Sequence, residues 1–300
     1  MRRIALVMRP QSEEVRRAEV DAAVAALRAS GHDVAVHMTG GDGDDRRYAR
    51  AASLDGCDVV VAAGGDGTVN GVVNGLVDAA GAAPASAGAA LAVVPMGTAN
   101  DFARGLDLPS SLHDALQVAA EGRPAQFDTG RVNGLCFINV STGGFGADAT
   151  QAASRGAKRL LGPLAYLVEG ARRLISFDPG RALFRIDGET VHDGQFIFFA
   201  VGNSAVTGGG TRIAPRADPA DGRLDVVLVC GSSRLDFLSL LPDLRVGTHL
   251  EGPDVSYFHA RTVEVRSDRT VPVNADGESI DGSVFTYDVL DRPLTVMVPA

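Results

Sequence analysis

Long apolar runs are missing from this chain of 300 residues. A helix that crosses a bilayer needs about eighteen to twenty apolar residues in succession, and no segment of the sequence supplies them. The N-terminus enters the short apolar stretch 4–8 at once, without the cleavage pattern of a signal peptide. We therefore expect a mature, cytoplasmic protein, whose association with a membrane is peripheral.

Cysteine, histidine and lysine are too sparse for several kinds of site. Cys57, Cys136 and Cys230 form no CxxC pair and lie in apolar runs, which is typical of buried free thiols. The six histidines show neither HxxxH nor HExxH spacing, so we expect no histidine-bound zinc. Lys158 is the only lysine, and a mechanism that needs a catalytic lysine is confined to that position.

Positive charge is also in short supply. The net charge is -9, whereas a surface that binds a nucleic-acid duplex needs a basic excess to displace condensed counterions. General nucleic-acid binding is therefore not expected. The hydrophobic content of 45% with mixed charge is typical of a packed globular protein, and the length allows two domains.

The first third of the chain alternates short apolar runs with alanine-rich helical stretches. Strands are predicted at 4–8, 34–37, 58–63 and 91–94. A helix is predicted over 14–29, where Val20, Val24 and Leu27 repeat at helical spacing and Gly31 marks the end. This alternation predicts an α/β domain with a parallel sheet covered by helices.

From about residue 128 the pattern changes to strands separated by turns. Strands are predicted at 181–186, 195–201, 224–229, 262–266, 271–274 and 284–289, and together they indicate a mostly antiparallel β-sandwich. One helix is expected at 163–175, with basic residues on both sides. It is interpreted either as an ordinary packed helix or as a surface that meets anionic lipid headgroups.

A glycine-rich motif, Gly64-Gly65-Asp66-Gly67-Thr68, joins a predicted strand to a predicted helix. Backbone amides of such a turn can approach phosphate closely, and the N-terminal end of the helix favours negative charge. It is not a Walker loop, which needs lysine, and Asn70 stands where a dinucleotide fingerprint needs its third glycine. Phosphate binding is favoured, with a purely structural turn as the alternative.

The stretch 95–101, Pro-Met-Gly-Thr-Ala-Asn-Asp, repeats the arrangement of strand, loop and helix. Ligands of open parallel sheets bind outside the carboxyl ends of the strands, so both loops are expected to face one crevice. Thr98 could donate a hydrogen bond to phosphate and Asp101 could help to hold a cation. Alternatively, Asn100 and Asp101 are helix caps.

Four runs of residues resemble those of the bacterial diacylglycerol kinase-like lipid kinases: GGDGT at 64–68, PMGTAND at 95–101, GGGTRIAPRADPADGRLDV at 208–226 and NADGE at 274–278. The resemblance covers almost the whole chain in the right order. It implies an α/β ATP-binding domain of the NAD kinase and phosphofructokinase type at 1–127. It also implies a β-sandwich lipid-substrate domain at 128–289 and a last segment, about 290–300, that returns to the first domain.

The resemblance also implies roles for individual residues. ATP would be contacted by Thr39, Gly64, Gly65, Asp66, Gly67, Thr68, Val69, Asn70 and Thr98. A structural Mg²⁺ would be held by the carboxylate of Asp221 and by the backbone carbonyls of Asp218 and Arg223, although the residues alone indicate only a polar turn.

Three further acidic positions follow from the same resemblance. Glu278 would be the proton acceptor, with Asp276 as a close competitor, although Asp-Gly-Glu alone is more often a hairpin turn. Asp128 would join Asp101 and Asp276 in a carboxylate cluster that holds the reactive Mg²⁺.

Two departures from the family pattern stand out. After the first strand the chain has Arg9-Pro10-Gln11-Ser12-Glu13 where relatives have an Asn-Pro followed by a Ser-Gly type of turn. Gly71 stands where relatives often have glutamate. The contribution of the first loop to nucleotide binding is therefore open.

The expected function is ATP-dependent transfer of the γ-phosphoryl group to the hydroxyl of diacylglycerol or a similar lipid alcohol, with Mg²⁺. The alternatives are a kinase of a soluble acceptor such as NAD and a catalytically silent nucleotide-binding protein. The expected partner is a lipid at a membrane surface, and the sequence leaves a homodimer open.

Overall fold

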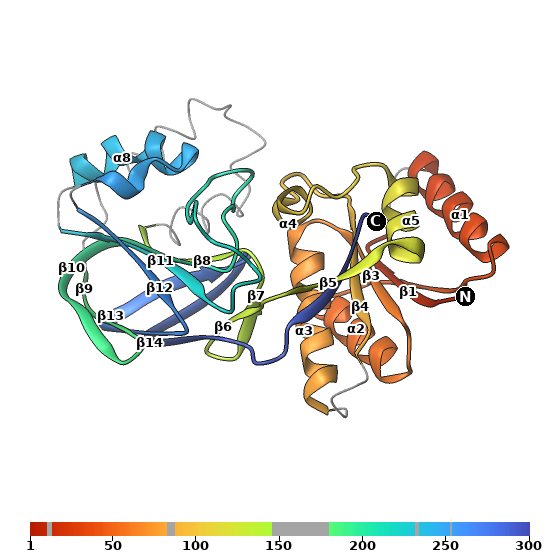
Figure 1. The fold of residues 1–300 in the computed structure, drawn as a ribbon, viewed down its shortest axis with the longest axis horizontal. Coiled ribbons are helices and arrows are strands. Elements are labelled where there is room, and N and C mark those ends of the chain that lie inside the picture. The colour runs from red at the N-terminus through yellow and green to blue at the C-terminus, as the bar shows by residue number, and fades with distance from the viewer. Residues whose placement is uncertain (11–13, 83–87, 146–179, 232–233, 253) are drawn as a thin grey trace. The chain divides into compact units, whose positions relative to one another are not determined.

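The computed structural model describes residues 1–10, 14–82, 88–145, 180–231, 234–252 and 254–300 (Figure 1). The chain forms two compact units, one of residues 1–127 with 292–300 and one of residues 128–291. Within the described ranges, no helix is both long enough and apolar enough to cross a membrane. The predicted helix 163–175 and Lys158 lie outside the described residues.

The first unit is built on a six-stranded sheet in the order β2-β1-β3-β4-β15-β5. Its strands are β1 (Arg3–Met8), β2 (Asp33–Met38), β3 (Val59–Gly64), β4 (Ala90–Pro95), β5 (Arg123–Phe127) and β15 (Leu294–Val298). All neighbours are parallel except β15 and β5, which are antiparallel. The predicted parallel sheet is confirmed, and the last strand of the chain lies between β4 and β5.

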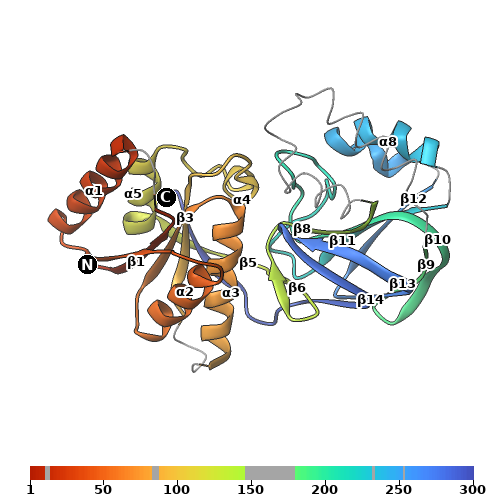
Figure 2. The same cartoon turned by 180° about the vertical axis from the view of Figure 1, so that it is seen from behind.

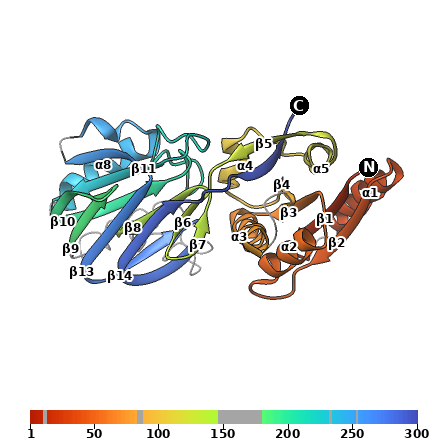
Figure 3. The same ribbon diagram turned by 60° about the horizontal axis from the view of Figure 1, so that its bottom comes forward.

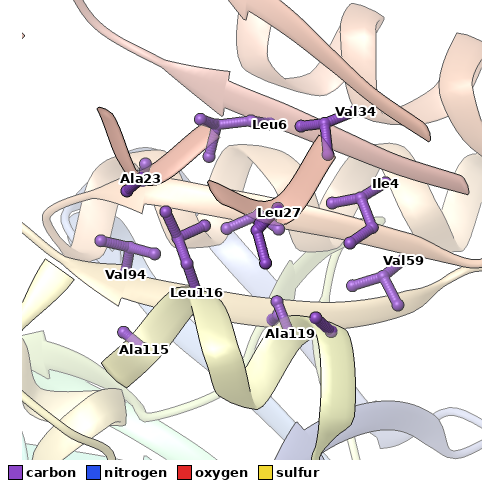
Figure 4. Packing of buried hydrophobic residues seen from close by; sticks show 14 of the residues in the cluster. Ile4, Leu6, Ala23, Leu27, Val34, Val59, Val94, Ala115, Leu116 and Ala119 are labelled. Carbon is purple, nitrogen blue, oxygen red and sulfur yellow. The ribbon is translucent and has the colours of Figure 1, made fainter. Parts of the chain in front are cut away.

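Helices cover both faces of this sheet: α1 (Glu14–Ala29), α2 (Asp44–Leu54), α3 (Asp66–Ala82), α4 (Asp101–Gly105) and α5 (Leu112–Glu121). Leu27 of α1 and Leu116 of α5 pack against alternate strand residues such as Ile4 on one face (Figure 4). The intervening strand residues are buried too, and α2 and α3 lie on the opposite side (Figure 3). The unit is therefore a three-layer α/β structure.

Helices α2 and α3 pack unusually closely because glycines of α3 face α2. A β-carbon added at Gly75 would lie 2.3 Å from the carbonyl oxygen of Arg46, and one at Gly71 would lie 2.4 Å from Cγ of Asp45. The guanidinium of Arg46 also forms a two-pronged ion pair with Asp78 at 2.7 and 3.0 Å. At Gly71, the carboxylate of Asp45 thus occupies the space that a side chain would need.

The second unit is a nine-stranded antiparallel sheet in the order β12-β11-β10-β8-β13-β14-β6-β7, with β9 paired to β10 and β13. Its strands are β6 (Gly130–Val132), β7 (Leu135–Phe137), β8 (Val140–Gly144), β9 (Gly180–Ile186), β10 (Glu189–Gly202), β11 (Leu224–Cys230), β12 (Val255–Ala260), β13 (Thr262–Ala275) and β14 (Glu278–Val289). Two apolar clusters flank it, one of them with Phe237 of α8 (Arg234–Val246).

The structure corrects several predicted elements of the second unit. The strands predicted at 262–266 and 271–274 are two halves of β13, which is irregular between Arg266 and Val271. Its partner β14 begins at Glu278 rather than at residue 284, and the two long strands run side by side (Figure 2). Helix α8 was not predicted, because its apolar residues lack a clear helical stripe and Pro242 lies inside it.

Candidate active site

The glycine motif is divided between a strand end and a helix start. Gly64 is the last residue of β3, and α3 begins at Asp66, so Thr68 and Asn70 already belong to the first two turns of the helix. Both side chains are buried, and Asn70 Oδ1 accepts a hydrogen bond from Asn74 Nδ2 at 2.7 Å. A ligand would meet the motif through Gly65, Asp66 and Gly67, which are at least partly exposed.

The second loop lies directly against the first. A β-carbon added at Gly97 would come within 2.4 Å of Gly65 Cα, and one at Gly65 within 3.1 Å of Gly97 Cα. Only residues without side chains allow the two backbones to approach so closely. The two polar loops, predicted to face one crevice, are therefore in contact at the carboxyl ends of β3 and β4.

Asp66 ties the two loops together. Its Oδ1 accepts a hydrogen bond from the backbone amide of Asp101 at 2.8 Å, and its Oδ2 accepts one from Asn100 at 3.0 Å. These amides are at the N-terminus of α4, so a carboxylate from α3 caps another helix. Asp66 thus links the two loops. This role could not be predicted from the residues next to it in the sequence.

Asn100 holds the second loop closed. It occupies the N-cap position of α4 with φ 52°, a left-handed conformation that asparagine tolerates. Its side chain turns back to Gly97, accepting from the amide at 2.9 Å and donating to the carbonyl at 2.9 Å. Although Asn100 stands at the N-cap position, the carboxylate that accepts the first amides of α4 is that of Asp66. Thr98, in the same loop, is exposed.

A cavity of about 320 Å³ opens at these loops. The described residues that line it are Arg9, Ala63, Gly64, Gly65, Gly67, Thr68, Met96 and Gly97. Thr39 and Thr98 are not among them; Thr39 follows β2, is 8% exposed and donates its amide to the carbonyl of Met8 at 2.9 Å. Arg9 was not predicted as a site residue, and the sequence signal for it was the departure after the first strand.

In the second unit, Asp276 and Gly277 form the two-residue turn between β13 and β14, with φ of 48° and 98°. Positive φ at both positions indicates a type I′ hairpin, for which Asp-Gly is a favoured pair. Asp276 is nevertheless buried, and its carboxylate accepts the amides of Ile138 at 2.7 Å, Asn139 at 3.1 Å and Val140 at 3.1 Å. This carboxylate anchors the β7–β8 connection.

Glu278 is placed differently from Asp276. It is the first residue of β14, pairs with Ala275 across the hairpin and is exposed. In the described part of the chain its carboxylate makes no hydrogen bond or ion pair. Of the two candidates for the proton acceptor, Glu278 is the one whose oxygens are accessible to a substrate.

Asp128 lies against the polar turn 218–223. Its Oδ2 accepts the amide of Gly222 at 2.6 Å, and its own amide donates to the carbonyl of Pro219 at 2.6 Å. Burial raises the pKa of the Asp128 carboxyl, and the negative charges of Asp221 and Asp218 raise it further, whereas the Gly222 hydrogen bond lowers it. Three carboxylates therefore gather at this turn, and the charge of Arg261, which lowers the pKa of Asp128, has less influence than that of Asp221 or Asp218.

The turn 218–223 offers a hard cation one carboxylate and backbone carbonyls, but no cluster of side-chain ligands among the described residues. Among the described residues, no group of three or more acidic, histidine or cysteine side chains is arranged to hold a metal ion. One carboxylate with two backbone carbonyls, as expected for Asp221 with Asp218 and Arg223, does not need such a group. A cation there would offset the repulsion from Asp221 and Asp218, which adds to the effect of burial on the pKa of Asp128.

The other predicted metal cluster is spread over both units. Asp101 belongs to the first unit, and Asp128 and Asp276 belong to the second. Within the second unit, the Nδ2 of Asn203 donates to the carbonyls of Asp128 and Ile138, both at 3.0 Å, and the amide of Ile138 in turn donates to the Asp276 carboxylate at 2.7 Å. The three-carboxylate site remains a prediction.

Comparison with known families gives two matches along the chain. Residues 3–132 match the diacylglycerol kinase catalytic domain, and residues 139–298 match the YegS C-terminal NAD kinase beta sandwich-like domain. A "Probable lipid kinase YegS-like" of Chromohalobacter salexigens is 39% identical over 94% of this chain and 89% of its own length. One of Pseudomonas aeruginosa PAO1 is 36% identical over 94% and 90%.

Solved structures show the same fold. A diacylglycerol kinase from Bacillus anthracis aligns with TM-score 0.79 and 23% identity, covering 99% of this chain and 97% of its own. An NAD kinase from Archaeoglobus fulgidus, solved in complex with ATP, aligns with TM-score 0.55 and 15% identity over 98% and 93%.

Proposed function

Since the chain belongs to the YegS-like lipid kinases with a diacylglycerol kinase catalytic domain, we propose that it transfers the γ-phosphoryl group of ATP to the hydroxyl of diacylglycerol or a similar lipid alcohol. The two family matches and the similar lipid kinases confirm the family that the four motifs predicted. The observation that carries the proposal for ATP is a cavity lined by residues of both the 64–68 and the 95–101 motifs.

The nucleotide side of the reaction depends on positioning. Two glycines of the cavity wall, Gly65 and Gly67, leave the backbone accessible, and the N-terminus of α3 favours negative charge. The Asp66 bridge fixes this loop relative to the second one. Phosphoryl transfer requires little covalent chemistry from a protein, so a rigid cradle for the polyphosphate is what we expect here.

The acceptor side is assigned to Glu278. Its exposed carboxylate can accept the proton of a lipid hydroxyl as the oxygen attacks the γ-phosphorus. Asp276, whose oxygens are engaged by three backbone amides, is assigned instead to holding the hairpin on which Glu278 is mounted. The exposure of Glu278 and the burial of Asp276 support this assignment of the two carboxylates.

Mg²⁺ is part of the proposal. The turn 218–223 would hold a structural ion through Asp221 and two backbone carbonyls. A second Mg²⁺, bound with ATP, would neutralise charge that develops on the transferred group, and Asp101 and Asp128 are the residues proposed to help hold it. The lipid would be reached by peripheral association with a membrane surface of the cytoplasm.

The test is ATP-dependent phosphate transfer to a panel of lipid alcohols in mixed micelles, with Mg²⁺ present or chelated. We expect transfer to one lipid class and a loss of about 100-fold or more in kcat for Glu278→Gln, since proton acceptors contribute about that much. Glu251 is another exposed glutamate of the same unit, so Glu251→Gln is the matched control and should retain activity.

The same assay with NAD as acceptor separates the proposal from its alternatives. Efficient phosphorylation of NAD without lipid turnover would replace the lipid acceptor by a soluble one. ATP binding without ADP release in the presence of any acceptor would indicate a silent nucleotide-binding protein. Full activity of Glu278→Gln would remove the proposed proton acceptor.

A further inference from the structure

Arg9 is the first residue after β1, and its position places it beside the glycine motif. Strands β1 and β3 are parallel neighbours in which Met8 is paired with Ala63. The next residue on each strand is therefore Arg9 on one and Gly64 on the other. Both residues line the cavity at the carboxyl ends of these strands.

The cavity contains one charged side chain among the described residues of its wall, and that side chain is Arg9. The other lining residues are glycines, Ala63, Thr68 and Met96. The acidic residue of the motif, Asp66, uses both carboxylate oxygens to accept the amides of Asn100 and Asp101. The ionic character of the cavity wall is consequently positive.

A polyphosphate needs more than backbone amides. Its negative charges are commonly met by a lysine in phosphate loops, and this chain has a single lysine among its 28 basic residues. Arginine offers a planar group with several donors that matches phosphate oxygens in pairs, and it stays charged at all working pH values.

We propose that Arg9 binds the polyphosphate tail of the nucleoside triphosphate. Through Arg9, the altered loop after β1 would still contribute to nucleotide binding. The inference rests on the proposed nucleotide function of this cavity and adds to it a specific binding residue. It also assigns a role to Arg9, the first residue of the departure after β1, where the sequence alone leaves the contribution of the loop open.

The experiment measures nucleotide affinity of the full chain by calorimetry, with Mg²⁺ present. ATP, inorganic tripolyphosphate and AMP are the probes, and the variants are Arg9→Gln, Arg9→Lys and Arg50→Gln. Arg50 is an exposed residue of α2, so its substitution makes the same change of charge away from the cavity wall. Thermal melting of each variant reports whether it is folded.

We expect Arg9→Gln to weaken ATP and tripolyphosphate binding about 10-fold to 100-fold, the range for loss of charge-assisted hydrogen bonds. AMP, with one phosphate, should be affected less, and Arg9→Lys should recover part of the loss. Equal affinities for Arg9→Gln and Arg50→Gln would overturn the role of Arg9 while leaving the kinase proposal intact. Failure of the wild type to bind ATP would overturn both.

Discussion

Replacing Gly97 by alanine should separate the two loops of the cavity that is proposed to bind the nucleotide. The added β-carbon would lie 2.4 Å from Gly65 Cα and 2.8 Å from Asn100 Oδ1. Carbon atoms in contact prefer a separation of about 3.5–4.0 Å, so the loops must move apart by about 1 Å. Neither atom can move away easily. Gly65 Cα belongs to the backbone, and the Asn100 side chain is held by two hydrogen bonds to Gly97.

The consequence for binding follows from the size of this movement. A displacement of about 1 Å in a positioned site can cost about 100-fold in rate, and we expect a loss of about 10-fold to 100-fold in ATP affinity. Overpacking should also lower the free energy of unfolding by about 1–3 kcal/mol. Calorimetry with ATP and urea unfolding measure the two effects in the same preparation.

The matched control is Gly105→Ala. Gly105 ends α4 in the same segment, and a β-carbon there would have no atom within 4 Å. This variant should bind ATP and unfold as the wild type does. If Gly97→Ala also binds ATP with unchanged affinity, the close contact of the loops does not shape the nucleotide site, and the reasoning is refuted.

Three further predictions concern packing, anchoring and pH. Gly75→Ala should destabilise the chain by about 1–3 kcal/mol in urea unfolding because its β-carbon meets backbone of α2, whereas Gly71→Ala should cost less, since the Asp45 carboxylate it meets can rotate away. Asp276→Ala should cost about 3 kcal/mol or more, because three buried amides lose their acceptor. Without divalent cations, stability should fall as pH rises from 3.8 through the raised pKa of Asp128, because ionisation there is disfavoured in the folded state, and added Mg²⁺ should reduce that fall.

Each of these has a clear contrary result. Equal stability of the two glycine variants would show that α2 moves freely over α3. A small effect of Asp276→Ala would mean that water replaces the carboxylate at the hairpin. Asp128→Asn removes the titrating group and should flatten the fall in thermal midpoint between pH 4 and 8; an unchanged profile would assign the pH dependence to other groups.

The parts of the fold that could be predicted are those with a local pattern. The helix 14–29 was predicted with its observed bounds because Val20, Val24 and Leu27 repeat on the face that is buried. Helix α2 was missed, since its burial comes from small residues against Gly75 rather than from an apolar stripe. Its sequence is mostly charged residues and alanine.

The motifs identified the candidate site residues, but the hydrogen-bond partners of these residues could not be inferred from sequence. The Asp66 carboxylate bonds amides 34 and 35 positions away, and the Asp276 carboxylate bonds amides 136 to 138 positions away. No periodicity reports contacts at such separations. Sequence thus names candidate carboxylates, whereas the structure shows that these two accept hydrogen bonds from backbone amides.

The place of β15 between β4 and β5 bears on synthesis in the cell. When residues 1–127 have left the ribosome, β4 and β5 have been synthesised. The strand that lies between them, β15, begins only at Leu294. Until then β4 and β5 each present an open edge to other chains. The first unit, although most of it is encoded first, is therefore completed last, and a nascent chain depends on its last strand to cover the edge of β4.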